Sequence, residues 1–307
     1  MVDGFINFNL NEKTPTIIKV IGVGGGGGNA VEYMYEKGIC DVDFVICNTD
    51  YQALRNSPIP CKIQLGKELT AGHGAGNNPA MGEKSAQESL ADIEAILKKD
   101  TRMAFITAAM GGGTGTGAAP VIARLSKDMG ILTVGIVSVP ARFEGPKRLD
   151  QARDGLRRLK DHVDCLIVID NEKIKSIYGS QTISQAFAKA NDVLNIAAKG
   201  IAEIITLPGY INVDFADVRT VMTDSGVAIM GAAQASGEDR AIRAITEALE
   251  SPLLNNNDIL GAKDILLNIT SGTDEITMDE MSQITSHIIR KVGNNAAVIW
   301  GVGTDPD

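Results

Sequence analysis

Two glycine clusters in this chain have the composition of phosphate-binding turns. They are Gly24 to Gly28, followed by Asn29, and Gly111 to Gly117, which reads GGGTGTG. Each follows an apolar β-branched run and precedes an amphipathic helical pattern, an arrangement that presents backbone N–H groups and a helix dipole to an anion. Glycine loses more conformational freedom on folding than any other residue, so such runs favour close approach of backbone to a ligand. For either cluster alone, a flexible turn is the alternative interpretation.

Other motifs narrow the class of nucleotide site. The P-loop pattern GxxxxGK[ST] does not occur, since Gly66-Lys67-Glu68 departs from it, and this excludes a P-loop ATPase. Gly22, Gly24 and Gly27 fit GxGxxG, and Asp50 stands where a ribose-binding acid would, so a Rossmann-type nicotinamide-dependent oxidoreductase is an alternative. The second cluster argues against that alternative, because its threonines could add hydroxyl donors to a phosphate chain.

The elements that must position these turns follow from the apolar pattern. Continuous apolar strands are predicted at 17–23, 44–47, 62–65, 103–108, 131–139 and 165–169, and helices near 29–37, 80–99, 116–129 and 146–162. Such strands, separated by helices, indicate a parallel sheet that is covered on both faces.

A second, smaller α/β layer is predicted after one long helix. Apolar residues at three- and four-residue spacing predict that helix over 184–207, and Pro208-Gly209 ends it. Beyond it, strands at 227–233, 265–269 and 296–302 alternate with helices at 238–250 and 277–291. The crevice beside the long helix is a natural place for a ligand.

Composition excludes several classes of partner. The formal net charge of -9, without a dense basic cluster, argues against nucleic acid. The four cysteines show no CxxC spacing, so reduced thiols and a cytoplasmic location are expected. No apolar run suggests direct membrane insertion. The three histidines are too scattered to suggest a transition-metal site.

The second glycine cluster resembles the tubulin signature, and the chain from about residue 15 to its end resembles the FtsZ family of bacterial cell-division GTPases. The resemblance implies an α/β fold with a Rossmann-like, tubulin-type parallel-sheet GTP-binding domain over 15–183. A central connecting helix (184–207) and a smaller α/β or α+β polymerisation domain (208–307) would follow it. Residues 1–14 would form a flexible extension, and the final strand, linker and tail of the family would be absent by truncation.

The resemblance also implies a set of nucleotide-binding residues. It assigns the phosphates to Gly25, Gly26, Gly27, Gly28 and Asn29 and to Gly112, Gly113, Thr114 and Gly115; a further nucleotide loop to Asn48-Thr49-Asp50; the γ-phosphate loop to 72–79, with Gly76; the ribose to Glu144 and Arg148; and guanine to Asn171, Asn191 and a stacked Phe187. An amide side chain both donates and accepts, so it can pair with a guanine edge. Without the family, the alternative interpretation of Asn171 is a turn residue at a strand end, and that of Phe187 is a core residue of the long helix.

Hydrolysis would be completed by a second copy of the chain. The resemblance implies that Asn212, Asp214 and Asp217 enter the nucleotide site of the next subunit. Asp214 and Asp217 are three residues apart, so at a helix start they share a face, although the same spacing is a helix-capping pattern. The implied assembly is a head-to-tail filament.

The remaining expectations concern cofactors and partners. GTP or GDP is the expected nucleotide, and Mg²⁺ is expected to arrive with the triphosphate without the sequence singling out its ligands. The implied partners are other copies of the chain and, through the missing tail, division adaptors and membrane tethers. The implied location is the cytoplasm at the mid-cell division site. A GTP-binding scaffold that polymerises without useful hydrolysis is a further alternative.

Overall fold

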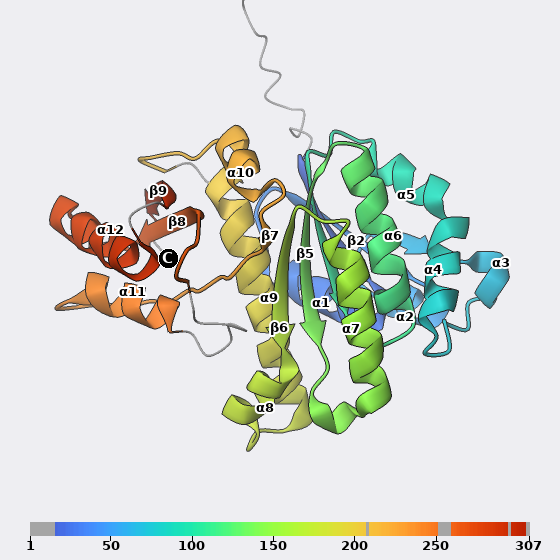
Figure 1. Ribbon diagram of the computed structural model, residues 1–307. Helices are drawn as coiled ribbons and strands as arrows, with labels where there is room; N and C mark the ends of the chain where they lie inside the picture. Colours follow the sequence, from blue (N-terminus) through green and yellow to red (C-terminus); the bar gives the residue numbers. More distant parts are fainter. Residues whose placement is uncertain (1–15, 207–208, 251–258, 294–295, 305–307) are drawn as a thin grey trace, which may run out of the picture.

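The computed structural model describes residues 16–206, 209–250, 259–293 and 296–304. Figure 1 shows a large sheet with helices on both faces, one long helix beside it, and a smaller unit on the other side of that helix. The predicted extension over 1–14 and the last three residues of the chain lie outside the described residues.

The large sheet has seven strands, all paired in parallel, in the order β3-β2-β1-β4-β5-β6-β7. The strands are β1 (Ile18–Val23), β2 (Val42–Asn48), β3 (Cys61–Gln64), β4 (Met103–Ala109), β5 (Leu132–Val139), β6 (Cys165–Asp170) and β7 (Gly226–Val227). The central strands are almost entirely buried, as continuous apolar runs predict. The parallel sheet expected from the sequence is therefore confirmed.

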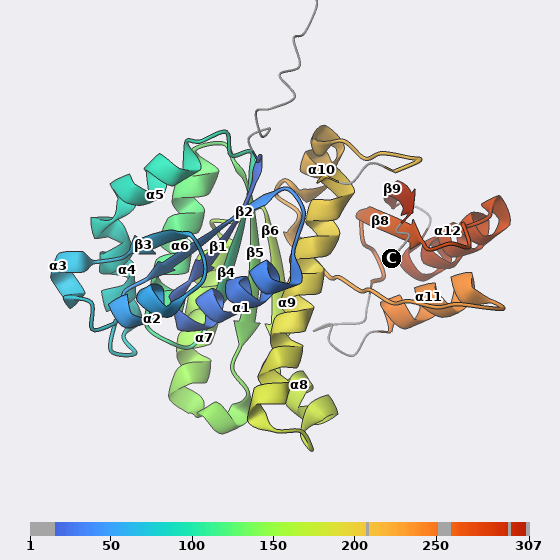
Figure 2. The same cartoon turned by 180° about the vertical axis from the view of Figure 1, so that it is seen from behind.

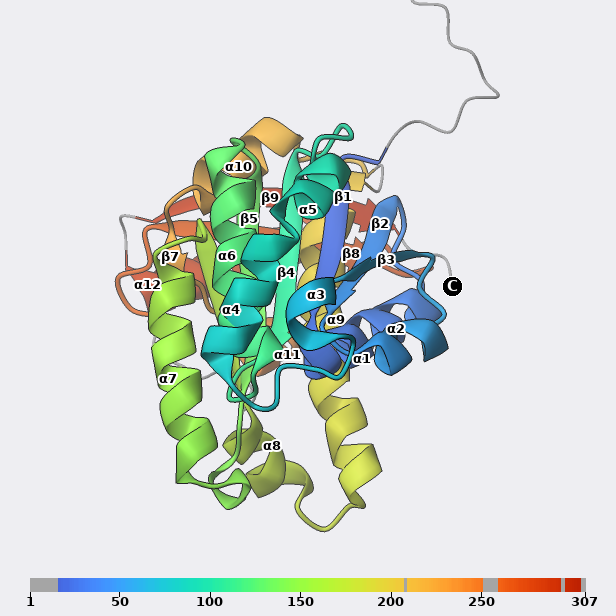
Figure 3. The ribbon, with the colours of Figure 1, turned by 90° about the vertical axis from the view of Figure 1, so that its right-hand side faces the viewer.

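Helices cover both faces of this sheet (Figures 2 and 3). One face packs against α1 (Gly24–Lys37), α9 (Ile183–Thr206) and α10 (Phe215–Met222). The other packs against α4 (Pro79–Glu88), α5 (Leu90–Leu97), α6 (Thr114–Asp128) and α7 (Pro146–Lys160). The short elements α2 (Tyr51–Asn56), α3 (Lys67–Thr70), η1 (Arg142–Glu144) and α8 (Asn171–Tyr178) lie in the connections. Each face thus has its own apolar core.

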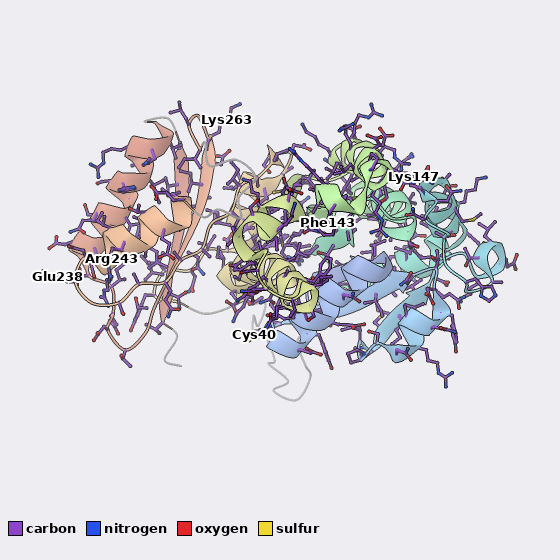
Figure 4. All side chains as sticks on the ribbon, turned by 90° about the horizontal axis from the view of Figure 1, so that it is seen from below. Cys40, Phe143, Lys147, Glu238, Arg243 and Lys263 are labelled. Carbon is purple, nitrogen blue, oxygen red and sulfur yellow. The ribbon has the colours of Figure 1, made fainter. Side chains whose placement is uncertain are left out.

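The smaller unit is built from two parallel strands and two helices. They are β8 (Asp264–Ser271), β9 (Ala297–Thr304), α11 (Arg240–Leu249) and α12 (Met278–Val292). Its core contains Ile245, Ile284 and Ile288. Figure 4, seen from below, shows Glu238, Arg243 and Lys263 on this unit, apart from Phe143 and Lys147 on the large one.

Three predicted elements differ from the structure. The first helix begins at Gly24 rather than at residue 29, so the first glycine cluster is helical. The predicted helix over 80–99 is two helices, because Ser89 leaves helical geometry and its hydroxyl accepts a hydrogen bond from the Gly66 N–H at 3.1 Å. The predicted strand over 227–233 is wrong beyond Val227, and the short strand observed there, β7 (Gly226–Val227), pairs with β6 in the large sheet.

Helix α9 separates two ends of the molecule. It runs from the end of the sheet where α8 lies to the end where α10 lies (Figure 1). At a rise of 1.5 Å per residue, a helix of its length spans about 36 Å. Side chains at its two ends cannot meet within one copy of the chain.

An ion pair fixes the start of α12 in the smaller unit. Arg240 contacts both carboxylate oxygens of Glu280, at 2.6 and 3.1 Å, and also donates to the carbonyl groups of Asp274 and Glu275. Glu280 in turn accepts from the N–H of Thr277, which completes a capping box. The Arg240 hydrogen bonds and then the Thr277 N–H lower the pKa of Glu280 to about 2.

The lowered pKa of Glu280 predicts a specific acid sensitivity. Because its folded pKa lies below the ordinary value of 4.5, this carboxylate stabilises the fold above pH 4.5 and loses that effect as pH falls towards 2. We expect Glu280→Gln to lower the thermal unfolding midpoint at neutral pH. Between pH 4.5 and 2, the midpoint of this variant should fall less steeply with pH than that of the parent chain. Circular dichroism melts across this pH range measure both effects.

Exposed Glu247 on α11 provides the matched control, since it takes no part in the contacts among Arg240, Thr277 and Glu280. Glu247→Gln is expected to follow the parent chain at every pH. Parallel pH profiles for Glu280→Gln and the parent chain would contradict the stabilising role of the Glu280 charge.

Candidate functional site

Both glycine clusters lie at the point where the strand order reverses. The first follows β1 and the second follows β4, and these two strands are neighbours in the centre of the sheet. Ligands of open parallel sheets bind outside the carboxyl ends of the strands at such a point. The two turns expected to bind an anion therefore lie side by side, at the carboxyl ends of β1 and β4.

The glycines divide into two groups by what surrounds them. A Cβ on Gly24 would lie 2.8 Å from the Gly115 nitrogen, and one on Gly115 would lie 2.7 Å from the Ala109 carbonyl oxygen. Added Cβ atoms would likewise collide with neighbours at Gly26, Gly27, Gly113 and Gly117. By contrast, a Cβ would meet no atom within 4 Å at Gly25, Gly28, Gly76 and Gly112. The first group allows close packing, and the second leaves open space for a ligand.

Two helices begin beside this open space without a side-chain cap. The N-cap of α1 is Val23 and that of α6 is Gly113, and neither caps its helix through a side chain. The first N–H groups of each helix have no intrahelical partner, and a bound anion can satisfy them. A phosphate gains roughly 0.3 to 2 kcal/mol from each such dipole. The geometry thus fits a phosphate chain.

The two threonines of GGGTGTG have different roles. The Thr116 hydroxyl is fully buried and accepts from the Gly111 N–H at 2.8 Å, so it orders the turn instead of facing a ligand. The Thr114 hydroxyl lies 2.7 Å from the Thr49 hydroxyl. The expectation that both threonines offer hydroxyls to phosphate is therefore wrong for Thr116.

The loop after β2 is held by its own side chains. Asp50 is the N-cap of α2, and its carboxylate accepts from the N–H groups of Gln52 and Ala53 at 2.8 and 3.2 Å. The Asn48 side chain accepts from the Asp50 N–H. The Asp50 carboxylate is thus engaged locally, which argues against the ribose-binding role that the oxidoreductase alternative requires.

Asn29, which follows the first glycine cluster, is exposed on α1.

The predicted ribose contacts form an ion pair with each other. Arg148 donates to Glu144 at 2.9 Å, and the other oxygen of Glu144 accepts from the Ala141 N–H at 3.0 Å. Both residues lie at the corner between η1 and α7, which Phe143 and Lys147 mark in Figure 4. Glu144 therefore shapes this corner in the structure.

The predicted guanine contacts come from two neighbouring helices. Asn171 begins α8, and its amide oxygen is buried and unpartnered within the described residues. The adjacent Asp170 caps α8, so the Asn171 side chain is not used for that purpose. Asn191 is half-buried on α9, and Phe187 is 47% exposed there, which contradicts its alternative as a core residue. A buried amide oxygen without a donor fits an N–H of a bound base.

The segment 212–217, called the acidic segment below, lies at the other end of α9. Asp214 is the N-cap of α10, and its carboxylate accepts from the Asp217 N–H at 2.9 Å, so the capping pattern is present. In that cap Asp217 contributes only its backbone, and both acids are exposed. The Asn212 amide oxygen accepts from the Gly209 N–H at 2.6 Å. Ile211 pairs with Val302 of β9, which fixes the segment to the smaller unit.

The described ranges contain no group of three His, Cys, Asp or Glu residues placed to hold a metal ion. Among the helices within those ranges, none has the length and apolar character needed to cross a membrane.

Sequence reasoning missed two contacts that support the site. Asn78, near the end of the 72–79 loop, caps α4, and the pair Asn78-Pro79 is a recognisable helix start. Gly82 on α4 packs its Cα against the Gly113 carbonyl, where a Cβ would lie 2.5 Å away. The spacing of the signature could not reveal that second contact, because it depends on how two distant helices cross.

Comparison with known proteins places both halves of the chain. Residues 17–179 match the family described as "Tubulin/FtsZ family, GTPase domain", and residues 226–307 match "FtsZ family, C-terminal domain". The cell division protein FtsZ of Porphyromonas gingivalis is 50% identical over 310 residues, covering 100% of this chain and 68% of that protein. FtsZ of Coxiella burnetii is 48% identical, covering 98% and 78%.

Solved structures agree with these matches. An empty FtsZ dimer from M. jannaschii superposes with a TM-score of 0.88 at 43% identity, covering 96% of this chain and 85% of that one. CetZ2 from Haloferax volcanii, at 22% identity, shares the fold with a TM-score of 0.79. The oxidoreductase alternative finds no support in these comparisons.

The two groups of glycines predict opposite effects of alanine. At Gly117 a Cβ would overlap the Pro79 carbonyl, so Gly117→Ala should lower the free energy of unfolding by about 1 to 3 kcal/mol. At Gly28, inside α1 and facing open space, alanine should leave that free energy equal or raise it by up to about 1 kcal/mol. Denaturant unfolding without nucleotide measures both, and equal destabilisation by the two substitutions would contradict this division.

Proposed function

Because this chain belongs to the Tubulin/FtsZ family, we propose that it binds GTP at the two glycine turns and hydrolyses it when another copy supplies the acidic segment. One observation carries the second half of this proposal. The glycine turns lie at the carboxyl ends of the parallel strands, the end at which α8 follows β6, whereas Asp214 and Asp217 lie at the start of α10, at the other end of α9. A site that needs both must therefore draw them from two copies.

The nucleotide would be held by backbone at one end and by side chains at the other. The open glycines Gly25, Gly28 and Gly112, with the uncapped starts of α1 and α6, suit the phosphates. The unpartnered amide oxygen of Asn171 suits an N–H of guanine, with Asn191 and Phe187 on the facing helix. Glu144 and Arg148 would border the ribose. A base that leaves a buried amide unpaired is rejected strongly.

Hydrolysis would depend on the exposed carboxylates. Asp217 has a side chain not used in the α10 cap, and it would orient a water at the γ-phosphate of the neighbouring copy. That water forms a bond to the γ-phosphorus as the bond to the β-phosphate oxygen breaks, giving GDP and phosphate. Asp214 and Asn212 would fix the segment that carries Asp217. Mg²⁺ would enter with the triphosphate and neutralise charge on it.

This division of the site determines the assembly. One end of a copy meets the other end of the next, and a heterologous contact of this kind propagates into a filament. In the cell we propose a cytoplasmic filament at the division site. Division adaptors and membrane tethers would bind through a C-terminal tail.

Substitution of Asp217 separates capping from catalysis. Asp217→Asn keeps the backbone N–H that Asp214 accepts, so the fold should retain its stability. Loss of a carboxylate that acts on water should lower phosphate release by about 100-fold to 10,000-fold. Phosphate release per polymerised copy, with pelleting to measure assembly, gives the result.

The control is Asp279→Asn, an exposed acid in the first turn of α12. It should leave turnover within twofold of the parent chain. Normal GTP hydrolysis by Asp217→Asn would refute catalysis by a neighbouring copy, and GTP-dependent pelleting of the parent chain without phosphate release would favour the scaffold alternative.

The dependence of rate on protein concentration is a second test. A site built from two copies should give a threshold followed by a steeper than linear rise in phosphate release. A self-contained enzyme gives a straight line through the origin. Measurement with GTP and Mg²⁺ over a hundredfold range of protein concentration distinguishes the two.

A further inference from the structure

A buried pair of hydroxyls connects the second glycine turn to the loop after β2. Thr49 follows β2 directly and is fully buried, while Thr114 begins α6 and is nearly so. Their oxygens lie 2.7 Å apart, and either hydroxyl can be the donor. Because Thr49 is fully buried, it cannot itself reach a ligand in the open space beside the glycines.

The backbone of Thr49 engages a third segment. Its carbonyl oxygen accepts from the Thr70 hydroxyl at 3.3 Å and from the Gly74 N–H at 3.3 Å. The next residue but one, Tyr51, donates its N–H to the Gly72 carbonyl at 3.1 Å. Thr49 therefore connects the start of α6 with the segment that leads into the 72–79 loop.

The direction of the hydroxyl pair depends on what Thr114 contacts. A hydroxyl has one proton to donate, and a phosphate oxygen only accepts. If Thr114 donates to a phosphate, its oxygen can still accept from Thr49. In that case Thr49 is the donor within the pair, and the Thr114 proton points away from Thr49 towards the phosphate.

We propose that Thr49 is a positioning residue whose hydroxyl donates to Thr114 and so directs the Thr114 proton to the phosphate chain of a bound guanine nucleotide. This inference rests on the proposed function, since it requires a phosphate at the start of α6. In this arrangement Thr49 does not contact the nucleotide itself. It orients the Thr114 hydroxyl, which does. Hydrogen bonds to charged acceptors are the stronger ones, so their loss is measurable as affinity.

The structure offers a matched control, a second buried hydroxyl pair that joins α6 to another element, in this case β5. At the other end of α6, the buried hydroxyls of Thr133 and Ser126 lie 2.8 Å apart. Thr49→Val and Thr133→Val each remove one hydroxyl from a buried hydroxyl pair at nearly constant volume. Only the first pair lies beside the glycine turns.

The test is calorimetric titration of the nucleotide-free chain with GDP and Mg²⁺, and then with a slowly hydrolysed GTP analogue. We expect Thr49→Val to weaken both affinities about tenfold, which corresponds to about 1.4 kcal/mol. Thr49→Ser, which keeps the hydroxyl, and Thr133→Val should stay within twofold of the parent chain. Thermal unfolding without nucleotide confirms that all three variants are folded.

Two results would overturn the inference while leaving the proposed function intact. One is unchanged affinity in Thr49→Val, and the other is equal weakening by Thr133→Val, which would indicate a general effect on α6. If Thr49→Val does not fold, failure of Thr49→Ser to restore affinity in a folded protein would also overturn it. A parent chain that binds neither nucleotide would refute the proposed function itself.

Discussion

The backbones at the start of α1 and the start of α6 touch, and the arrangement of the nucleotide end follows from that contact. Gly24 and Gly115 allow it, since a Cβ on Gly24 would lie 2.8 Å from the Gly115 nitrogen. Both helices begin without a side-chain cap, after neighbouring strands of the sheet. Their amino ends therefore face the same region, where the two dipoles act on one anion.

Much of this fold could be predicted from the sequence, because a buried parallel strand is a continuous apolar run. The start of α1 could not, since glycine is a poor helix former and the periodic pattern begins only at Asn29. The break at Ser89 depends on a hydrogen bond to Gly66 from a distant loop. Residues 228–233 have the composition of a strand but do not form one. A strand also needs a neighbouring strand to pair with, and the local sequence does not show whether one is in reach.

The site residues divide in the same way. The glycine turns could be predicted as a pair, yet which glycines pack and which face open space depends on neighbours such as Pro79 and Thr107 from other elements. The two interpretations of Asp214 and Asp217 turned out to be compatible, because the cap uses the Asp214 carboxylate and only the backbone of Asp217. The local sequence pattern was enough to identify the cap. The distance between the acids and the glycine turns could not be predicted in that way, because it depends on where α10 lies along α9.

The length of α9 has an arithmetic consequence for the proposed assembly. Since one copy carries half of a site at each end, a row of n copies contains n − 1 complete sites and two unmatched halves. The unmatched halves differ, as one end of the row displays glycine turns and the other displays carboxylates. Nucleotide bound at the first end has no neighbour to act on it. The two tips of any row would therefore differ chemically, even though every copy is identical.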